Sequence, residues 1–538
     1  MKRYINILMV ALATMMTSCL TEDPKDQLYE EDIYNNANNI YINAVAVLYN
    51  YIGGSADSEG LQGTCRGIYD YNTLTTDEAM IPIRGGDWYD GGLWTNMYQH
   101  KWSPNDLPLY NTWKYLYKVV VLSNKSLHII DKYSHNLSEE QRVAYEAEVR
   151  ALRALFYYYI MDMYGRVPIV TSYEQPQDEV VQSERSEVFR FIVNELQEVA
   201  ELLPNERSNK MGNYYGRITT PVAHFLLAKL ALNAEIYCDD NWTDGVPRNG
   251  KEIFFTVDGE KLNAWQTCVR YCDKLAEVGY RLEDDYSYNF SVHNENSNEN
   301  IFTIPLDKNL YAAQFWYLFR SRHYNHGGAL GGSSENGTSA NISTVLANGY
   351  GTDDVDARFE KNFYAGVVEV DGKPVMMDNG QQLEYFPLEL KLNLTGSPYV
   401  KTAGARMAKY EVDRTSHSDG RQPDNDIVLF RYADALLMKS EAKVRNGEDG
   451  SLELNEVRGR VGMPYREATL ENILKERLLE LVWEGWRRQD MVRFGVYHKS
   501  YDQRVQLADE KNGYTTVFPI PQKSIDLNPK LKQNVGYK

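Results

Sequence analysis

The sequence is short of basic residues and lacks the motifs that mark common enzyme classes. Asp and Glu outnumber Lys and Arg by 75 to 57, which gives a net charge of −18. Most of the surface would therefore repel a nucleic acid backbone, so we expect no nucleic acid partner. A nucleophile elbow, a phosphate-binding P-loop, an H-E-x-x-H zinc motif and a dinucleotide-binding glycine motif are all missing. We expect that the protein is not an enzyme, and no catalytic residue is predicted.

Long hydrophobic runs are also missing. A short one lies near the N-terminus. A basic start precedes a mostly apolar run over residues 5–16, and Cys19 follows. A membrane span needs about 20 apolar residues, so this pattern predicts a signal peptide over residues 1–18. Cys19 stands where a bacterial lipoprotein is cleaved. We therefore expect Cys19 to be lipidated and the mature chain to be anchored to the membrane without spanning it.

Cysteine is scarce, with five residues in the whole chain. Apart from Cys19 these are Cys65, Cys238, Cys268 and Cys272. Cys268 and Cys272 are four residues apart in a predicted helix, but no second Cys/His pair with zinc-finger spacing accompanies them. We interpret the four as buried thiols, and a Cys238–Cys272 disulfide remains the alternative in an exported protein.

What the sequence does contain is a series of amphipathic segments. Apolar and small residues recur with helical spacing, and glycine or proline ends most of these stretches. The spacing predicts helices over residues 143–164, 186–203, 219–237, 262–278, 432–446 and 471–488, with residues 454–462 separating the last two. Successive helices pair in the manner of tetratricopeptide repeats, although no strict 34-residue period fits the chain.

These patterns predict a mostly α fold, in which tetratricopeptide-like helix pairs form a scaffold. A loop-rich ligand-binding half with a few short β-strands completes it, since residues 367–370 and 375–377 resemble strands on either side of a turn. Long loops of this kind are usually functional. The expected division is a single domain over residues 19–538, with scaffold at about 40–280 and 427–538 and a loop-rich insert at about 284–426.

Aromatic residues gather in two segments, and glycines lie within the first and shortly after the second, at residues 327–328 and 331–332. Residues 84–94 hold Trp88, Tyr89 and Trp94 among four glycines, and residues 311–324 form the second segment. Exposed aromatic rings stack on the apolar faces of sugars, while neighbouring polar groups bind the hydroxyls. We therefore predict a glycan-binding site formed by Asp77, Arg84, Asp87, Trp88, Tyr89, Trp94 and Asn96.

Other uses of these residues stay open at this point. Each aromatic side chain can instead pack in the core or contact a partner protein. His323 and His326 are three residues apart, but such a pair in a glycine-rich loop is more often hydrogen-bonded than metal-bound. No cofactor is predicted. Acidic clusters at residues 353–356 and 419–426 leave calcium binding open, although neither has EF-hand spacing.

Several stretches together resemble one known family. Residues 148–168, 429–442, 476–495 and 518–537 are similar to the SusD/RagB family of nutrient-binding outer-membrane lipoproteins. The resemblance implies a tetratricopeptide-like scaffold, a loop-rich half with the ligand site, and a SusC-like TonB-dependent transporter as partner. It also implies capture of glycans, or of peptides in the RagB branch, without chemistry. The family takes ligand aromatics from an early loop and from a loop in the middle of the chain, so the resemblance adds Trp316 and Tyr317 to the predicted glycan-binding site.

The charged block in this resemblance also has a physical interpretation. Its charged side chains are spaced to form a network of ion pairs at the end of a helix, which we interpret as scaffold and not as catalytic groups. They are Glu480, Glu484, Arg487, Arg488, Asp490 and Arg493.

The sequence thus predicts a lipid-anchored outer-membrane protein that faces the cell exterior. From the resemblance we expect it to capture oligo- or polysaccharide and to deliver it to a SusC-like TonB-dependent transporter. A RagB-like peptide-binding lid of such a transporter is the alternative, and a glycan-cleaving enzyme is the third hypothesis.

Overall fold

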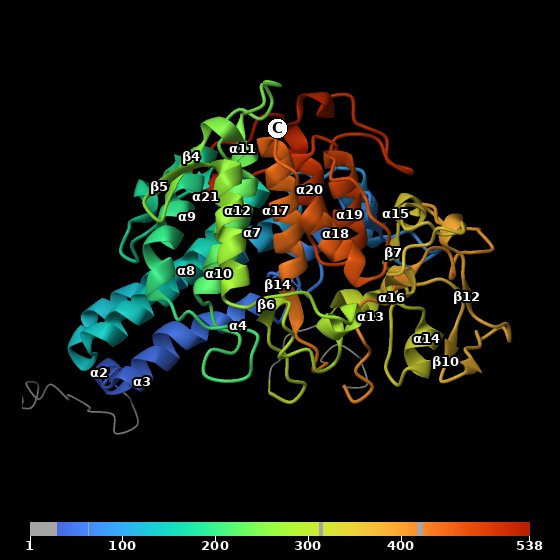
Figure 1. Cartoon of the computed structure of the whole chain (residues 1–538), viewed down its shortest axis with the longest axis horizontal. Helices are drawn as coiled ribbons and strands as arrows, with labels where there is room; N and C mark the ends of the chain where they lie inside the picture. Colours follow the sequence, from blue (N-terminus) through green and yellow to red (C-terminus); the bar gives the residue numbers. More distant parts are fainter. Residues whose placement is uncertain (1–28, 63, 311–315, 417–422, 538) are drawn as a thin grey trace, which may run out of the picture.

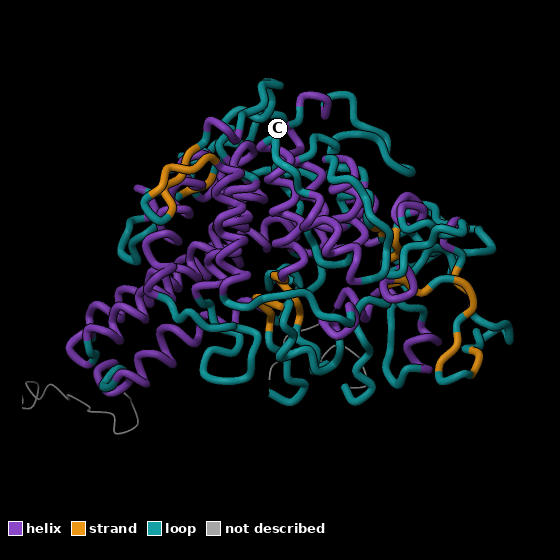
Figure 2. The backbone as a smooth tube through the Cα atoms, in the orientation of Figure 1, coloured by secondary structure: helices purple, strands orange, loops and turns teal. Residues whose placement is uncertain are grey.

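The computed structural model describes residues 29–62, 64–310, 316–416 and 423–537, and most of their regular structure is helical (Figures 1 and 2). The predicted signal peptide and Cys19 lie outside these residues. The longer helices are α7 (Leu107–Lys132), α8 (Glu139–Tyr164), α9 (Arg185–Val199), α10 (Thr220–Leu232), α12 (Ala264–Glu277), α17 (Tyr432–Asn446), α18 (Ser451–Arg460) and α19 (Leu470–Leu481).

Short helices occur along the whole chain. They are α2 (Glu30–Ile33), α3 (Ala37–Ile40), the π-helix η1 (Tyr41–Ala46), α4 (Val47–Gly53), α5 (Ile68–Thr73), α6 (Leu93–Tyr98), α11 (Ala234–Tyr237), α13 (Trp316–Ser321), α14 (Tyr324–Ala329), α15 (Ile342–Ala347), α16 (Phe359–Asn362), α20 (Arg487–Arg493) and α21 (Gln522–Leu527).

Strands are short and pair two by two in the described residues, always antiparallel. The pairs are β1 (Ala79–Met80) with β7 (Ser339–Ala340), β2 (Val167–Pro168) with β3 (Gln182–Ser183), β4 (Phe254–Val257) with β5 (Glu260–Asn263), β6 (Asn300–Ile304) with β14 (Ile427–Arg431), β8 (Phe363–Tyr364) with β13 (Arg406–Met407), β9 (Gly366–Val367) with β12 (Glu384–Tyr385), and β10 (Glu369–Val370) with β11 (Lys373–Pro374).

The long helices pack mainly on their neighbours in the chain. Helix α7 packs on α8, α8 on α9, α10 on α12, and α17 on α18 and α19. Helix α12 also packs on α17, so the early and late helices form one scaffold although the loop-rich segment lies between them in sequence (Figure 1). The predicted mostly α fold with tetratricopeptide-like helix packing is confirmed.

Helix α8 shows how local sequence and burial set one scaffold element. Ser138 and Gln141 form a capping box at its N-terminus, which satisfies two backbone N–H groups that the helix leaves open. From Ala147 to Tyr164 almost every residue is buried. A helix that is buried all round lies in the core, so α8 is a central element of the scaffold.

The predicted helix over residues 471–488 is wrong, because the structure breaks it. Helix α19 ends at Leu481, and α20 begins only at Arg487. Trp483 and Gly485 between them have φ of 70° and 74°, which a right-handed helix does not allow. The separating segment proposed at 454–462 lies largely within another helix, α18.

Smaller differences from the expected boundaries have local causes. The helix expected over 219–237 is interrupted near Asn233, where α10 gives way to α11. The helix expected from residue 262 starts at Ala264, because residues 260–263 form strand β5. The predicted turn at Asp371 and Gly372 is confirmed, since β10 and β11 flank it as a hairpin.

The loop-rich segment leaves and rejoins the scaffold at one place. Strand β6 near its start pairs with β14 directly after its end, and both strands are wholly buried. The segment between them carries most of the short strands and lies on one side of the helical scaffold (Figure 2).

Buried ion pairs join the two parts. Arg431 contacts Glu299 and Glu480 with its Nη1, at 2.6 Å in each case. Arg358 of the loop-rich segment contacts Glu476 and Glu480 of α19 at 2.6 and 2.7 Å. The predicted helix-end network is only partly confirmed. Asp490 and Arg493 pair with each other at 2.8 Å, whereas the other four predicted residues form ion pairs with partners elsewhere in the chain. Through Glu480 these buried pairs hold the loop-rich segment on the scaffold.

Three of the four described cysteines are buried, and Cys238 is half-buried. Cys65, Cys238, Cys268 and Cys272 are free thiols, so the alternative Cys238–Cys272 disulfide is wrong. Within the described residues, no helix combines the length and the apolar character that crossing a membrane requires.

Candidate functional site

A hollow of about 560 Å³ opens beside the first aromatic segment. Its volume is in the range of small-ligand sites. It is lined by Cys65, Arg66, Gly86, Asp87, Trp88, Asp90, Tyr324 and Glu335. Aromatic, acidic and basic side chains thus meet in one concave surface, which is the combination expected of a sugar-binding site.

The loop that carries Trp88 is sharply folded. Arg84 and Asp87 exchange backbone hydrogen bonds of 3.0 and 3.3 Å, and Gly85 in the turn between them has φ of 70°. Trp88 and Asp90 also have positive φ, at 64° and 41°. Such values are rare for residues with bulky side chains and collect at functional sites.

The indole of Trp88 is held in place but remains partly exposed. Its Nε1 donates a hydrogen bond of 3.1 Å to the Glu335 carbonyl, and its ring meets that of Trp94 edge-on at 6.0 Å. Gly337 packs so close that a Cβ there would lie 2.7 Å from the indole. A fixed aromatic ring loses little conformational entropy when a ligand stacks on it.

Asp87 links this loop to the second aromatic segment. Tyr324 donates a hydrogen bond of 2.9 Å to its carboxylate, and Lys401 Nζ lies 2.7 Å from the same oxygen. The bond from Lys401 lowers the pKa of Asp87, so the carboxylate is charged at neutral pH. Tyr89 beside it is 59% exposed. Exposed rings and a charged acceptor are therefore available to a ligand here.

Two of the predicted ligand residues are instead buried supports of the site. Trp94 is 1% exposed, and its Nε1 donates to Asp90 at 2.7 Å. Arg84 is also 1% exposed and donates to the Val400 and Ala403 carbonyls and to the Ser339 hydroxyl. In this conformation neither side chain offers a free face to a ligand.

The remaining predicted residues lie in different surroundings. Asp77 is paired with Arg487 through two contacts of 2.6 and 2.7 Å, so it belongs to the ion pairs of the scaffold. Asn96 is exposed on α6 but does not line the hollow. Trp316 and Tyr317 begin α13, and their side chains are outside the part that the structure describes.

The structure does bring the two aromatic segments together. Tyr324 bonds to Asp87, and the guanidinium of Arg320 lies 5.3 Å from the ring of Trp94. Sequence reasoning missed Arg66 and Glu335, which also line the hollow. Arg66 pairs with Asp57 and Asp90, and nothing in its local sequence pattern marks it as part of a site.

Two of the possible metal ligands are held in ion pairs. Asp356 pairs with Arg358 and Asp424 pairs with Lys308, while Asp419 lies outside the described residues. Burial lowers the pKa of His323 to about 4 and that of His326 to about 3, so both rings are neutral at physiological pH. No group of three His, Cys, Asp or Glu side chains within the described ranges is arranged to hold a metal ion.

The fold and the hollow define a class of protein: a helical-repeat scaffold that presents an aromatic binding hollow on a loop-rich half. Two family models match the chain, the SusD family over residues 279–537 and a family described as starch-binding and associating with the outer membrane over residues 31–232. The chain belongs to the SusD-like family.

Relatives cover most of the chain at low identity. Starch-binding protein SusD of Bacteroides thetaiotaomicron is 24% identical over 540 residues, which cover 90% of this chain and 89% of that protein. Surface glycan-binding protein A of the same species, solved in complex with laminarihexaose, is 21% identical with a TM-score of 0.69, covering 92% of this chain and 99% of its own. A SusD-like carbohydrate-binding protein of Bacteroides fragilis is 18% identical with a TM-score of 0.70, covering 93% and 100%. These structural likenesses show the fold.

Proposed function

We propose that the protein binds glycans at the hollow beside Trp88 and performs no chemistry on them. The observation that carries this proposal is the combination of the fixed, partly exposed indole of Trp88 with the exposed ring of Tyr89 and the charged carboxylate of Asp87. Sugar rings have an apolar face that stacks on such rings, and their hydroxyls donate to a carboxylate. The starch and laminarihexaose named for two relatives support the same ligand class.

The first test is affinity gel electrophoresis of the protein without residues 1–19. Starch, laminarin, xylan and pectin are the probes. We expect one of them to retard the wild-type protein, and Trp88→Ala to remove the retardation because the stacking surface is lost. Tyr89→Ala, at an exposed position, should weaken it without affecting the fold.

Tyr465→Ala is the matched control. Tyr465 is also highly exposed, and it is neither a lining residue of the hollow nor, like Tyr89, a direct neighbour of one in the chain. Retardation that survives both Trp88→Ala and Tyr89→Ala would contradict a site at this hollow. Release of shorter oligosaccharides from any bound glycan would contradict a purely binding role. If no glycan retards the wild-type protein, while peptides bind to it, the RagB-like alternative replaces the proposal.

We further propose that a lipid on Cys19 anchors the protein at the outer membrane, facing the exterior, and that it delivers glycan to a SusC-like TonB-dependent transporter. The N-terminal sequence pattern and the outer-membrane association in the family description support this placement. Metabolic labelling with a fatty acid should mark the wild-type protein and not Cys19→Ala. Equal labelling of both would contradict the anchor, and co-purification with a transporter tests the partner.

A further inference from the structure

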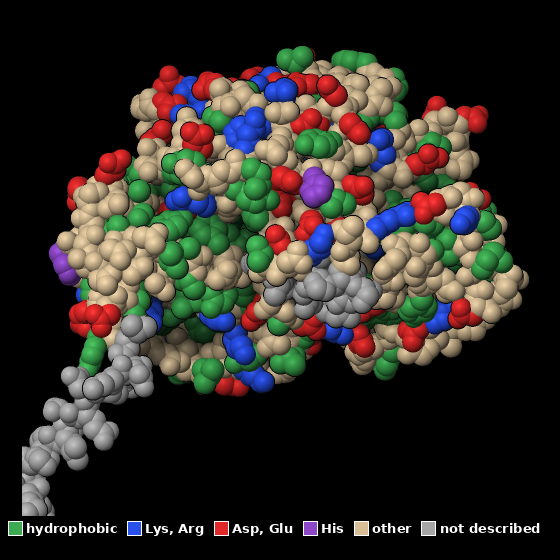
Figure 3. Space-filling model, turned by 90° about the horizontal axis from the view of Figure 1, so that it is seen from below, with side chains coloured by type: hydrophobic (Ala, Val, Ile, Leu, Met, Phe, Trp, Pro, Cys, Tyr) green, Lys and Arg blue, Asp and Glu red, His purple; other side chains and the backbone are tan. Residues whose placement is uncertain are grey.

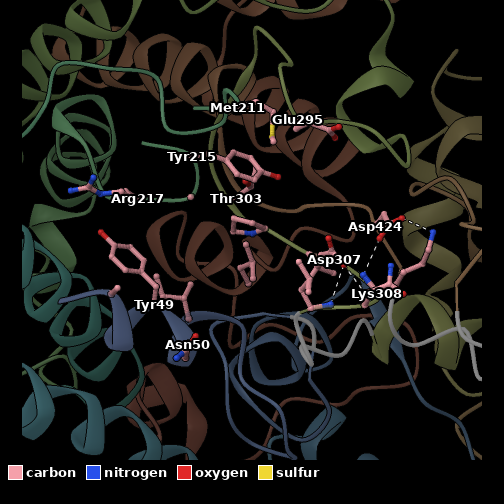
Figure 4. A pocket seen from close by; sticks show the side chains of 18 of the residues that line it. Tyr49, Asn50, Met211, Tyr215, Arg217, Glu295, Thr303, Asp307, Lys308 and Asp424 are labelled. Carbon is pink, nitrogen blue, oxygen red and sulfur yellow. Dashed lines mark hydrogen bonds and ion pairs between the residues drawn. The ribbon is translucent and has the colours of Figure 1, made fainter. Parts of the chain in front are cut away.

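A second and larger hollow, of about 770 Å³, opens near the N-terminal helices on the underside of the molecule (Figures 3 and 4). Three separate parts of the chain form its walls. Helix α4 and the π-helix η1 form one wall, residues 211–217 form another, and residues 303–310 after β6 form the third.

The floor of this hollow is apolar. Ile52, Pro305 and Leu306 line it, and Met211 and Leu310 stand at its edge with exposed fractions of 63% and 87%. Figure 3 shows hydrophobic side chains gathered on this face of the molecule. Apolar surface that is open to water is more stable when a ligand covers it.

Tyrosine rings stand in the walls and are held rigidly. The Tyr49 hydroxyl accepts from the Ile218 N–H at 2.9 Å and donates to Glu148. Arg217 binds the same carboxylate and lies 4.8 Å from the centre of the Tyr41 ring. These rings therefore face a ligand without further loss of side-chain entropy.

Tyr215 projects toward the same space as Tyr49 but from another wall (Figure 4). Its hydroxyl donates to Asp426 at 2.6 Å, which fixes this ring as well. Open polar groups stand beside the rings. Asn50 is exposed, and its side chain makes no hydrogen bond to any residue that the structure describes, while Glu295 has only a long contact of 3.5 Å with His293.

The two hollows are close neighbours. The carbonyl of Ile52, in the floor of the second hollow, accepts a hydrogen bond of 2.8 Å from the N–H of Leu61. Cys65, which lines the first hollow, follows four residues later. Four Cα steps of about 3.8 Å span at most about 15 Å, and the Cα atoms of a hydrogen-bonded backbone pair lie about 5 Å apart, so the Cα atoms of Ile52 and Cys65 are at most about 20 Å apart. One extended polysaccharide chain is long enough to cover this distance.

We propose that the second hollow is a carbohydrate subsite and that a single polysaccharide chain occupies both hollows. The inference rests on the proposed glycan-binding function and extends it from a single site to a long chain. An apolar floor, fixed tyrosine rings and open amide and carboxylate groups repeat the chemistry of the Trp88 hollow. Two linked contacts raise the affinity for a long chain above that of either hollow alone.

The test uses substitutions that place a large side chain in the second hollow. The substituted positions are exposed, so the fold should stay intact. Asn50→Trp and Met211→Trp are the filling variants, and Ala276→Trp, at an exposed position of α12, is the control. One probe is the polysaccharide among starch, laminarin, xylan and pectin that retards the wild-type protein. The other probe is a trisaccharide of the same polysaccharide. Binding of both is measured by calorimetry.

Both filling variants should bind the polysaccharide at least tenfold more weakly, because one of two linked contacts is lost. They should change the affinity of the Trp88 hollow for the trisaccharide less than twofold. The control Ala276→Trp should change neither the affinity for the polysaccharide nor that for the trisaccharide. If both filling variants bind the polysaccharide as tightly as the wild-type protein does, the second subsite is overturned. In that case the proposed function at the Trp88 hollow still stands, provided that Trp88→Ala abolishes binding. A wild-type protein that binds none of the four glycans would overturn both proposals.

Discussion

At the scale of single residues, Asp426 is a buried carboxyl group that forms no ion pair with any residue the structure describes. It is 1% exposed and accepts hydrogen bonds from the hydroxyls of Tyr215 and Thr303 and from the N–H of Leu306. Burial raises its pKa from 3.8 to about 7, since three neutral donors do not fully replace water around the charge. The ionised form is therefore unfavourable in the folded protein.

Asp426→Asn should remove a pH dependence of stability. The pKa of Asp426 is higher in the folded chain than in the unfolded one, so its stabilising effect is complete below pH 3.8 and is lost as the pH rises through 7. Relative to Asp426→Asn, the wild-type free energy of unfolding should fall by up to about 4 kcal/mol over that window. Urea unfolding of both proteins at several pH values measures it, and parallel pH profiles would contradict the expectation.

The aromatic residues show what sequence could and could not predict at this scale. The pattern of residues 84–94 predicted an aromatic cluster, and Trp88 does line a hollow, with the exposed Tyr89 next to it in the chain. It could not separate them from Trp94, which is buried between the guanidinium groups of Arg66 and Arg320 at 5.4 and 5.3 Å. These arginines are distant in sequence, so only the folded chain decides which ring is covered.

At the scale of secondary-structure elements, the break between α19 and α20 depends on long-range partners. The backbone N–H of Trp483 donates to Glu78 at 2.9 Å, and its indole donates to the Asn362 carbonyl at 3.0 Å. Both partners come from other parts of the chain. The hydrophobic pattern of residues 471–488 suits a continuous helix, and these tertiary bonds favour the break.

Gly485→Ala should destabilise the protein by about 1–2 kcal/mol, because Gly485 has φ of 74° and an added methyl would lie 3.3 Å from the ring of Tyr69. Gly459→Ala is the matched control. Gly459 lies inside α18, and a Cβ added there would meet no atom within 4 Å. Alanine at this position should therefore stabilise the helix by about 0.5–1 kcal/mol. Chemical unfolding of both variants compares them, and a stability gain in Gly485→Ala would contradict the assigned break.

The helices themselves were predictable wherever burial alone sets the pattern. Helix α17 has the predicted bounds of residues 432–446, and α8 contains the whole of the segment predicted over residues 143–164. The pairing of β6 with β14 was not predictable, since more than a hundred residues separate the two strands. Every residue of both strands is buried. Alternation along a strand, the usual sequence signal, is missing when both faces are buried.

At the scale of the whole molecule, the net charge and the two hollows both limit which ligands the surface can bind. A net charge of −18 keeps the chain away from anionic surfaces, while the two hollows present aromatic and apolar groups. Neutral glycans are not repelled by such a surface. The same surface favours uncharged polysaccharides over strongly acidic ones, which is the order we expect in the electrophoresis panel.

The complex with its proposed transporter should bind glycan more tightly than the isolated protein does. Each aromatic contact contributes about 0.5–1.5 kcal/mol beyond burial if values for aromatic pairs apply, so a few contacts give micromolar affinity or weaker. A transporter surface that contacts the same polysaccharide adds a linked site, which should raise the affinity about 100-fold or more. Calorimetry on the protein with and without its transporter measures the difference. Equal affinities would mean that this chain alone supplies the whole binding surface, because a transporter that contacted the glycan would have to add to the free energy of binding.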